Sequence, residues 1–233
     1  MATETVENYV KALYTLTRES PTGEAGMKSL ATLVGVTTGT ATTMVKRLAT
    51  AKLAKYERFG GVRLTSKVEA AAVDILRRHR LVETFLVQTL KLDWSVVHNE
   101  AERLEHAVSP TVLEALDRHL GHPSHDPHGD PIPSAEGHVR EPGGRPLTEF
   151  GPGARLRVVR IADQDSTFLT FVAGSGLRPG SLIEVRTLDS AAQTMTVQSK
   201  ARDTVALALT AAAKIWCEGR DQTVDVPKRS STK

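Results

Sequence analysis

The chain has 233 residues, enough for two domains or one large one, and its 40% hydrophobic and 24% charged content is ordinary for a globular protein. Its single cysteine, Cys217, excludes an internal disulfide and a Cys-rich zinc site and fits a reducing cytoplasm. No segment approaches a membrane span, and the first ten residues lack the apolar run of a signal peptide. We therefore expect a cytoplasmic protein with no membrane partner.

Charge is unevenly distributed, although the net charge is only +3. Residues 1–70 carry ten Lys and Arg against six Asp and Glu, whereas residues 71–140 carry seven against eleven and hold all eight histidines. A basic segment before an acidic, His-rich one indicates a polyanion binder coupled to a cation binder. Scattered surface charge is the alternative explanation.

The first part of the chain has the pattern of a helix-turn-helix. Apolar residues at helical spacing behind Thr3 or Thr5 predict a first helix. Residues 28–34 predict a short helix that ends at Gly35, and a further helix follows from Thr37. Two short helices about a glycine turn are typical of a helix-turn-helix.

The helix after Thr37 has a polar face that favours DNA binding. Threonine is a poor helix former, so a face crowded with threonines indicates contacts with base edges and phosphates. A merely polar helix is the alternative. We predict DNA contacts from this face and from a following hairpin: Thr37, Thr38, Thr40, Thr42, Thr43, Lys46, Arg47, Arg58 and Arg63.

The hairpin completes a winged helix-turn-helix. Residues 53–59 and 62–65 predict two strands across Gly60-Gly61, which would supply the positive φ values of a two-residue turn. The two arginines near its tip would touch phosphate.

A long helix is predicted from the capping-box pattern at Ser66–Glu69 to about Leu90. His79 lies on its apolar seam, one turn before Glu83. A histidine on such a seam is either a satisfied core residue or a metal ligand.

Residues 98–106 predict a second helix, capped by Asp93, with two chemically distinct faces. One face is apolar, and an arc of roughly 100° beside it carries four potential ligands. These are His98, Glu102, Glu105 and His106. Two imidazoles and two carboxylates can hold a divalent metal. A solvated face on a core helix is the alternative.

Ser109-Pro110 predicts the start of another helix, whose apolar stripe could close the domain or pair two subunits. That stripe comprises Val112, Leu113, Leu116 and Leu120. Residues 121–146 then form a Pro-, Gly- and His-rich segment, which is either a solvated linker or a functional loop. Its potential extra ligands are His122, His125, Asp126 and His128.

From Leu147 the pattern changes to short strands separated by Gly- and Pro-containing turns. Strands are expected at residues 156–161, 182–185, 194–197 and 204–207. Four or five short strands within about 80 residues predict a small barrel. Residues 211–216 predict a closing turn of helix, and the polar tail from Val226 is expected to be disordered.

Taken in order, the winged helix, RRHRLVETFL, VHNEAERLEHAVS, DPHGDPIP and LRPGSLIEV resemble the diphtheria toxin repressor/manganese transport regulator family over about residues 4–218. The resemblance implies an α+β multidomain chain in four parts. These are a winged helix-turn-helix DNA-binding domain (1–70), an all-α metal-binding and dimerisation domain (71–140), an SH3-like β-barrel (147–220) and a polar tail (226–233). It also implies a homodimeric bacterial regulator that binds double-stranded operator DNA when loaded with Fe(II) or Mn(II), usually repressing metal-uptake genes.

The resemblance also implies the metal ligands. His79, Glu83 and His98 match one ligand cluster of the family, and Asn8, Glu102, Glu105 and His106 match the other. Glu102 stands where iron-type members have Cys, and Asn8 stands where they have Met and manganese-type members usually have Asp. Hard oxygen donors suit Mn(II). We therefore expect Mn(II) as the cofactor, with Fe(II) as the alternative and other divalent metals able to substitute in vitro.

Two details of this ligand set stay open. Asn8 offers a neutral carbonyl oxygen where an anion is expected, which would weaken the site or pass the role to water. Asp126 and His128 match a segment that, in some manganese-type relatives, joins a second site with a barrel carboxylate. Asp163 or Asp165 could supply that carboxylate here.

Two other functional classes are consistent with parts of the sequence. A metal-dependent hydrolase would use the His/Glu cluster to activate water. The sequence has no HExxH or GxSxG motif, and a hydrolase would leave the winged helix unexplained. We therefore do not expect an enzyme. A winged-helix regulator that senses an organic ligand would make the histidines incidental, but we expect no organic cofactor.

Overall fold

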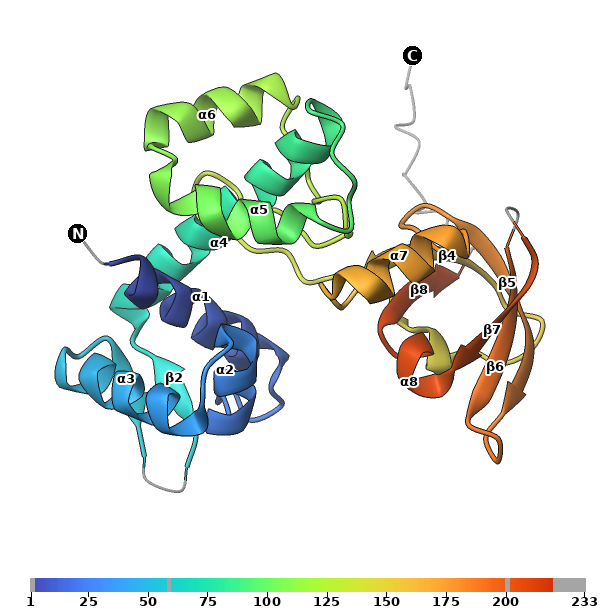
Figure 1. Cartoon of the computed structure of the whole chain (residues 1–233), viewed down its shortest axis with the longest axis horizontal. Helices are drawn as coiled ribbons and strands as arrows, with labels where there is room; N and C mark the ends of the chain where they lie inside the picture. The colour runs from blue at the N-terminus through green and yellow to red at the C-terminus, as the bar shows by residue number, and fades with distance from the viewer. Residues whose placement is uncertain (1–2, 58–59, 200–201, 220–233) are drawn as a thin grey trace, which may run out of the picture. The chain divides into compact units, whose positions relative to one another are not determined.

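The computed structural model describes residues 3–57, 60–199 and 202–219, so Arg58 and the tail from Val226 lie outside the described residues. Contacts divide the chain into two compact units, each with its own core (Figure 1). The first is formed by Met1–Lys91, Asn99–Ser124 and Pro131–Arg140, and the second by Leu92–His98, His125–Asp130 and Glu141–Lys233. None of the helices in the described ranges is long and apolar enough to cross a membrane.

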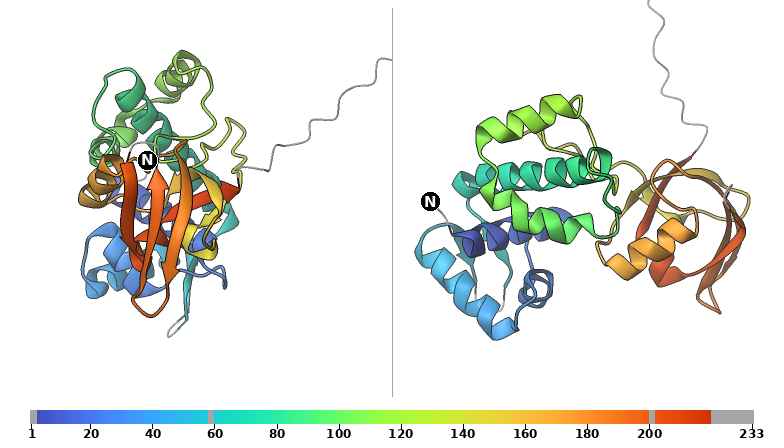
Figure 2. Two further views of the ribbon diagram at one scale, coloured as in Figure 1. Left: turned by 90° about the vertical axis from the view of Figure 1, so that its right-hand side faces the viewer. Right: turned by 45° about the horizontal axis from the view of Figure 1, so that its top comes forward.

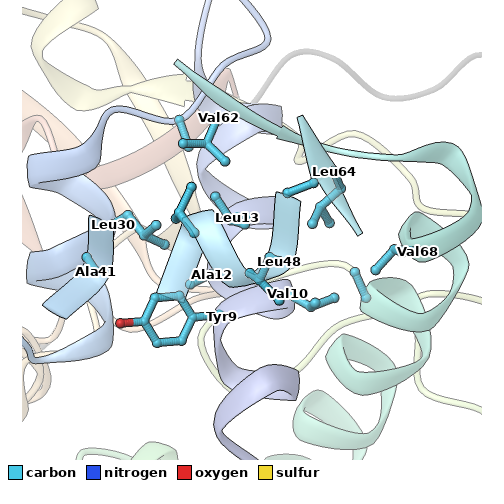
Figure 3. Packing of buried hydrophobic residues seen from close by; sticks show 14 of the residues in the cluster. Tyr9, Val10, Ala12, Leu13, Leu30, Ala41, Leu48, Val62, Leu64 and Val68 are labelled. Atoms are coloured by element: carbon cyan, nitrogen blue, oxygen red, sulfur yellow. The ribbon is translucent and has the colours of Figure 1, made fainter. Parts of the chain in front are cut away.

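The first unit begins with the predicted helices, α1 (Glu4–Glu19), α2 (Met27–Val34) and α3 (Thr38–Thr50). Thr3 caps α1, since its hydroxyl accepts a hydrogen bond from the backbone of Val6. Gly35 ends α2 at a φ of 72°, a left-handed conformation that glycine adopts without steric cost. The three helices bury one continuous apolar core with the hairpin (Figure 3).

The hairpin is shorter than predicted and its glycine has a different role. Its strands are β1 (Ala54–Tyr56) and β2 (Val62–Leu64), paired antiparallel. Gly61 does not adopt a positive φ, so the expected two-residue turn is wrong. A Cβ at Gly61 would instead collide with the side chain of Glu24, whose carboxylate accepts a hydrogen bond from the Gly61 amide. Glycine is needed here for close approach.

The helical segment contains α4 (Ser66–Gln88), α5 (Val97–Leu104), a 3₁₀ turn η1 (Glu105–Ala107) and α6 (Pro110–His119). The predicted capping box is wrong, because Thr65 is the N-cap of α4 and makes no side-chain cap bond. Asp93 does not cap α5 either, since its carboxylate accepts hydrogen bonds from Ser95 within the turn that precedes the helix. Ser109 caps α6 as predicted.

The single helix expected over residues 98–106 is in fact two elements. The α-helical hydrogen bonding ends at Leu104, and Glu105 begins the tighter 3₁₀ turn. The chain must reach the extended Val108 before Ser109 and Pro110, and a 3₁₀ turn is a common way to end an α-helix. The break changes the direction of Glu105 and His106 relative to Glu102.

The apolar stripe of α6 divides between the core and the surface. Leu113 is buried with Leu81 of α4 and with Ile132. Val112 is 48% exposed, and Leu104 at the end of α5 is 44% exposed. The stripe therefore closes the helical core and leaves large apolar side chains on the surface as well.

The Pro-, Gly- and His-rich segment is not a solvated linker at its centre. Within the second unit, the Asp126 carboxylate accepts hydrogen bonds from the amides of His128 and Asp130. The His128 ring is fully buried, stacks on Trp94 and hydrogen-bonds to the Trp94 carbonyl at 2.9 Å. Backbone and ring contacts therefore fix residues 126–130 in one conformation.

The second unit contains an antiparallel sheet in the order β3-β8-β4-β5-β6-β7. The strands are β3 (Arg145–Pro146), β4 (Arg155–Ile161), β5 (Leu182–Asp189), β6 (Thr194–Ser199), β7 (Arg202–Ala208) and β8 (Ile215–Gly219). Register shifts interrupt the β4–β8, β5–β6 and β6–β7 pairs. Such bulges bend strands and increase twist, and the sheet curls into the predicted SH3-like barrel (Figure 2).

Three short elements complete this unit. The 3₁₀ turn η2 (Leu147–Glu149) follows β3, and α7 (Ser166–Gly174), capped by Asp165, was not expected. The predicted closing helix lies earlier than expected, as α8 (Leu209–Ala212), since residues 215 and 216 belong to β8. Leu169 and Val172 of α7 are fully buried, so this helix contributes to the barrel core.

Candidate metal centre and DNA-binding surface

One face of α1 carries polar side chains toward the helical segment. Lys11 follows Glu7 by four residues and Asn8 by three, so it shares a face with each of them, while Tyr9 and Leu13 are buried in the core. The core therefore fixes the rotation of α1, and this rotation places its polar face against α5 and η1 within the first unit.

Two carboxylates, one from α5 and one from η1, lie against this face of α1. Lys11 Nζ lies 2.5 Å from Glu102 Oε1 and 2.7 Å from Glu105 Oε1. Glu105 is fully buried, and the Lys11 side chain is 12% exposed. One ammonium thus sits between two carboxylates, one of which has no access to solvent.

His106 is oriented for a further ligand. Its Nδ1 donates to Glu7 Oε2 at 2.6 Å, whereas its Nε2 is buried without a hydrogen-bond partner among the described residues. A carboxylate that accepts a hydrogen bond from one ring nitrogen of a histidine fixes the tautomer, and this leaves the other nitrogen able to bind a metal. That free Nε2 lies 3.6 Å from Glu105 Oε1.

These groups fit a divalent cation. Asn8 Oδ1 is likewise buried without a hydrogen-bond partner in the part of the chain that the structure describes. Buried polar atoms are rarely left unpaired, so two orphaned lone pairs beside a carboxylate pair are suited to hold a cation or a water molecule. Asn8, Glu102, Glu105 and His106 would supply oxygen and nitrogen ligands for it.

His79 is shared between two acidic groups. Its Nδ1 lies 2.5 Å from Glu105 Oε2, and its Nε2 lies 2.9 Å from Glu83 Oε1. One ligand atom each from His79, Glu102 and Glu105 lies within 4.8 Å of the other two. The seam histidine is therefore part of the acidic cluster and is not a packing residue alone.

The cluster shifts the acidity of its members. Burial by itself would lower the pKa of His79, and the adjacent ammonium acts in the same direction. The carboxylates of Glu83 and Glu105 outweigh both and raise this pKa to about 9. Burial would raise the pKa of Glu105, but hydrogen bonding and charge from His79 and then Lys11 hold it below its ordinary value. The metal-free cluster is therefore a network of charged groups.

The remaining predicted ligands belong to the second unit. His98, half-buried, lies in the first turn of α5, and Asp126 and His128 are buried in the loop already described. Asp163 pairs with Lys214 and accepts a hydrogen bond from the Asp165 amide. All of these groups have structural partners, and their metal roles stay predictions. His122, also weighed as a ligand, is exposed and pairs with Asp117 of α6.

Two residues of the centre were not predicted, namely Glu7 and Lys11. Their sequence signal was present, because they lie on the same helical face as Asn8. A lysine is a poor candidate ligand, however, and a glutamate in the first turn of a helix is commonly explained by the helix dipole.

The predicted DNA-binding face of α3 is exposed. Thr43, Lys46, Arg47 and Thr50 line an open hollow on this face. Thr42 and Thr43 donate their hydroxyl hydrogens to carbonyls of their own helix, and Thr37 caps the helix through the Thr40 amide. These hydroxyls therefore offer lone pairs and neighbouring methyl groups to a ligand. In the wing, Arg63 pairs with Glu24.

Family models match three consecutive segments of the chain. The iron dependent repressor N-terminal DNA-binding domain matches residues 1–62, and the iron dependent repressor metal-binding and dimerisation domain matches residues 65–134. The FeoA domain matches residues 145–219. These segments correspond to the winged helix, the helical segment and the barrel.

Individual relatives agree with these matches. The chain is 29% identical over 206 residues to the iron-dependent repressor IdeR of Mycobacterium tuberculosis, covering 83% of this chain and 89% of that protein. It is 37% identical over 113 residues to the transcriptional regulator MntR of Escherichia coli, covering 48% of this chain and 71% of that protein. A solved manganese-dependent transcriptional repressor in complex with manganese superposes with a TM-score of 0.84 at 38% identity, covering 91% of this chain and 99% of that chain. The chain therefore belongs to the diphtheria toxin repressor/manganese transport regulator family of metal-dependent transcriptional repressors.

Proposed function

We propose that this protein is a Mn(II)-activated, homodimeric repressor of metal-uptake genes, and that it is not an enzyme. The observation that carries the choice of metal is the junction of α1 with α5 and η1. The donors there, among the described residues, are oxygen and nitrogen atoms around the Glu102–Glu105 carboxylate pair. Hard oxygen donors suit Mn(II), whereas sulfur would favour softer metals. Fe(II) is the alternative cofactor.

The bridging site would couple metal binding to DNA binding. Asn8 belongs to α1, which shares its core with α3, whereas Glu102, Glu105 and His106 belong to α5 and η1. A cation bound by ligands from both α1 and the α5–η1 segment would fix the winged helix relative to the helical segment. In a dimer, this would hold the two α3 helices at the spacing of consecutive major grooves of operator DNA.

We propose a second metal position at His79 and Glu83, while the role that the family resemblance implies for His98 stays a prediction. Its support is that His79 and Glu83 lie one turn apart on α4, are both buried and are 2.9 Å apart at Nε2 and Oε1. Asp126, His128 and Asp163 stay candidates for further ligands, in competition with their present hydrogen bonds.

The exposed apolar residues fit a subunit interface. Leu104 and Val112 are large apolar side chains that are partly exposed on the helical segment. Such side chains are commonly covered in an assembly, and a two-fold dimer would match the symmetry of an operator. The DNA contacts would then come from the α3 face and the wing of both protomers.

A binding assay tests the proposal. The full-length protein is titrated onto DNA from its own promoter region with EDTA, Mn(II), Zn(II) or anaerobic Fe(II), at one salt concentration. DNA binding should need a divalent metal, and the free-metal concentration at half-maximal DNA binding should be lowest with Mn(II). Binding that is indifferent to EDTA would instead favour a regulator of organic-ligand type. Turnover of generic esters with Mn(II) would favour the hydrolase.

A further inference from the structure

Lys11 is the unexpected component of the metal centre. Its ammonium donates to Glu102 Oε1 at 2.5 Å and to the two oxygens of Glu105 at 2.7 and 2.9 Å, and it lies 3.4 Å from His79 Nδ1. The donors of His79, Glu102 and Glu105 are close enough together to hold a metal ion. The ammonium therefore lies where these three residues would place a cation.

We propose that Lys11 is a resident counter-ion, which fills the space between His79, Glu102 and Glu105 and competes with the metal for the two carboxylates. An ammonium has three donors and no lone pair, so Lys11 cannot ligate a metal and must move aside for one. The side chain sets the metal concentration at which the centre loads. This inference rests on the proposed assignment of Glu102 and Glu105 as metal ligands.

A cation is needed here when metal is absent. Glu105 is fully buried, and an unpaired buried carboxylate is strongly destabilising. Lys11 supplies positive charge from α1, beside the His79 ring that also contacts Glu105, and so connects the winged helix to the helical segment. The Lys11 side chain is 12% exposed, and under the proposal its flexible four-carbon stem lets the ammonium move toward solvent when a metal binds.

A purely structural ion pair would look different. Two basic groups, Lys11 and His79, face the three carboxylates of Glu83, Glu102 and Glu105, so negative charge is in excess even when His79 is protonated. Asn8 Oδ1 and His106 Nε2 also lack hydrogen-bond partners among the described residues. Neither of those lone pairs can be satisfied by an ammonium that is already bound to three carboxylate oxygens. The metal-free cluster is stable enough to fold but incomplete in both charge and hydrogen bonding.

The test compares Lys11→Leu with wild type in two measurements. Thermal unfolding in EDTA reports the metal-free state, and Mn(II) affinity is measured by titration against a competing chelator. Loss of the ammonium should lower the metal-free Tm, and Mn(II) should restore it. Mn(II) should bind about tenfold more tightly or better, the scale on which one close opposite charge shifts ionic equilibria.

Two controls isolate the charge and its position. Lys11→Arg keeps a cation at the cluster and should stay close to wild type in both measurements. Lys67→Leu removes an exposed lysine at the start of α4 and should leave Mn(II) affinity unchanged. If Lys11→Leu folds only with Mn(II), the proposal is supported, because a cation then replaces the ammonium. If it folds in neither condition, Lys11→Gln is judged by the same two measurements.

The outcomes separate this inference from the assignment of the site. Unchanged or weaker Mn(II) binding by Lys11→Leu, with Glu102→Ala binding lost, would overturn the counter-ion role and keep the site. Wild-type Mn(II) affinity in Glu102→Ala would overturn the site itself, and the counter-ion proposal with it.

Discussion

In the first unit one ammonium, that of Lys11, faces two carboxylates, whereas in the second unit the guanidinium of Arg160 is paired with the carboxylate of Asp130. Both clusters are largely buried. The Arg160–Asp130 pair is 10% and 8% exposed, with 2.7 Å between Nε and Oδ1, and the guanidinium also lies over the Trp216 ring. The charges of that pair balance.

The difference teaches how a structural ion pair can be told from an ion-binding cluster. Asp130 also donates its amide to Asp126, so both the side chain and the backbone of this residue are used. Around Lys11 the charges do not balance, and buried lone pairs of Asn8 and His106 lack hydrogen-bond partners within the described ranges. The Arg160–Asp130 pair therefore needs no further ion, whereas the cluster around Lys11 does.

The largest expected effect concerns the balanced pair. Asp130→Ala removes a buried carboxylate that pairs with the Arg160 guanidinium and should lower the free energy of unfolding by about 3–5 kcal/mol. Chemical denaturation of metal-free protein measures this loss, and Arg160→Leu in the same chain should recover part of it. Mn(II) affinity should not change. If Asp130→Ala had normal stability but no longer bound Mn(II), the proposed difference between the two clusters would be wrong.

The next effect concerns a ligand of the unbalanced cluster. Glu102→Ala should weaken Mn(II)-dependent operator binding by at least about 100-fold. Loss of a direct ligand should weaken metal binding at least as much as loss of a group that only orients a ligand. The shift is measured as the Mn(II) concentration at half-maximal DNA binding. Glu100→Ala, two residues earlier on α5 and partly exposed, is the matched control. An unchanged midpoint in Glu102→Ala would contradict the proposed ligand set.

Glu7 tests whether the orientation of His106 matters. Glu7→Gln keeps the size of the side chain but weakens its hydrogen bond with His106 Nδ1, which is 2.6 Å long. Loss of such an orienting carboxylate typically costs about 10–100-fold in metal affinity. Glu4→Gln, exposed in the first turn of the same helix, should have no effect on titrated Mn(II) affinity. Equal affinities in the two variants would mean that Glu7 does not position a ligand.

Much of the fold could be predicted because its signals are local. Helical periodicity, a Gly35 terminus and a Ser109-Pro110 cap identify helices from neighbouring residues alone. The α7 helix was missed because its sequence, STFLTFVAG, is rich in β-branched and aromatic residues, which favour strands. It is helical because Asp165 caps it and the barrel core covers Leu169 and Val172.

The candidate metal centre could be predicted only in part. Glu102, Glu105 and His106 are close in sequence, and the family resemblance linked them to Asn8. The contacts of Lys11 depend on how α1 packs against η1, and on a 3₁₀ turn at Glu105 that helical periodicity does not predict. Long-range packing decides both, so sequence patterns could not identify the counter-ion.

An exposed cation should show the smallest effect in this comparison. Lys46 on α3 lies on the proposed DNA-binding face, in the open hollow, and is exposed. Lys46→Ala should leave stability and Mn(II) affinity unchanged, because solvent already screens this charge. If Lys46 contacts phosphate, the variant should bind Mn(II)-dependent operator DNA more weakly and lower the slope of log affinity against log salt by about one. The loss should be equal on random-sequence DNA of the same length, since phosphate contacts carry no sequence information. A loss confined to the operator would instead assign Lys46 to base recognition.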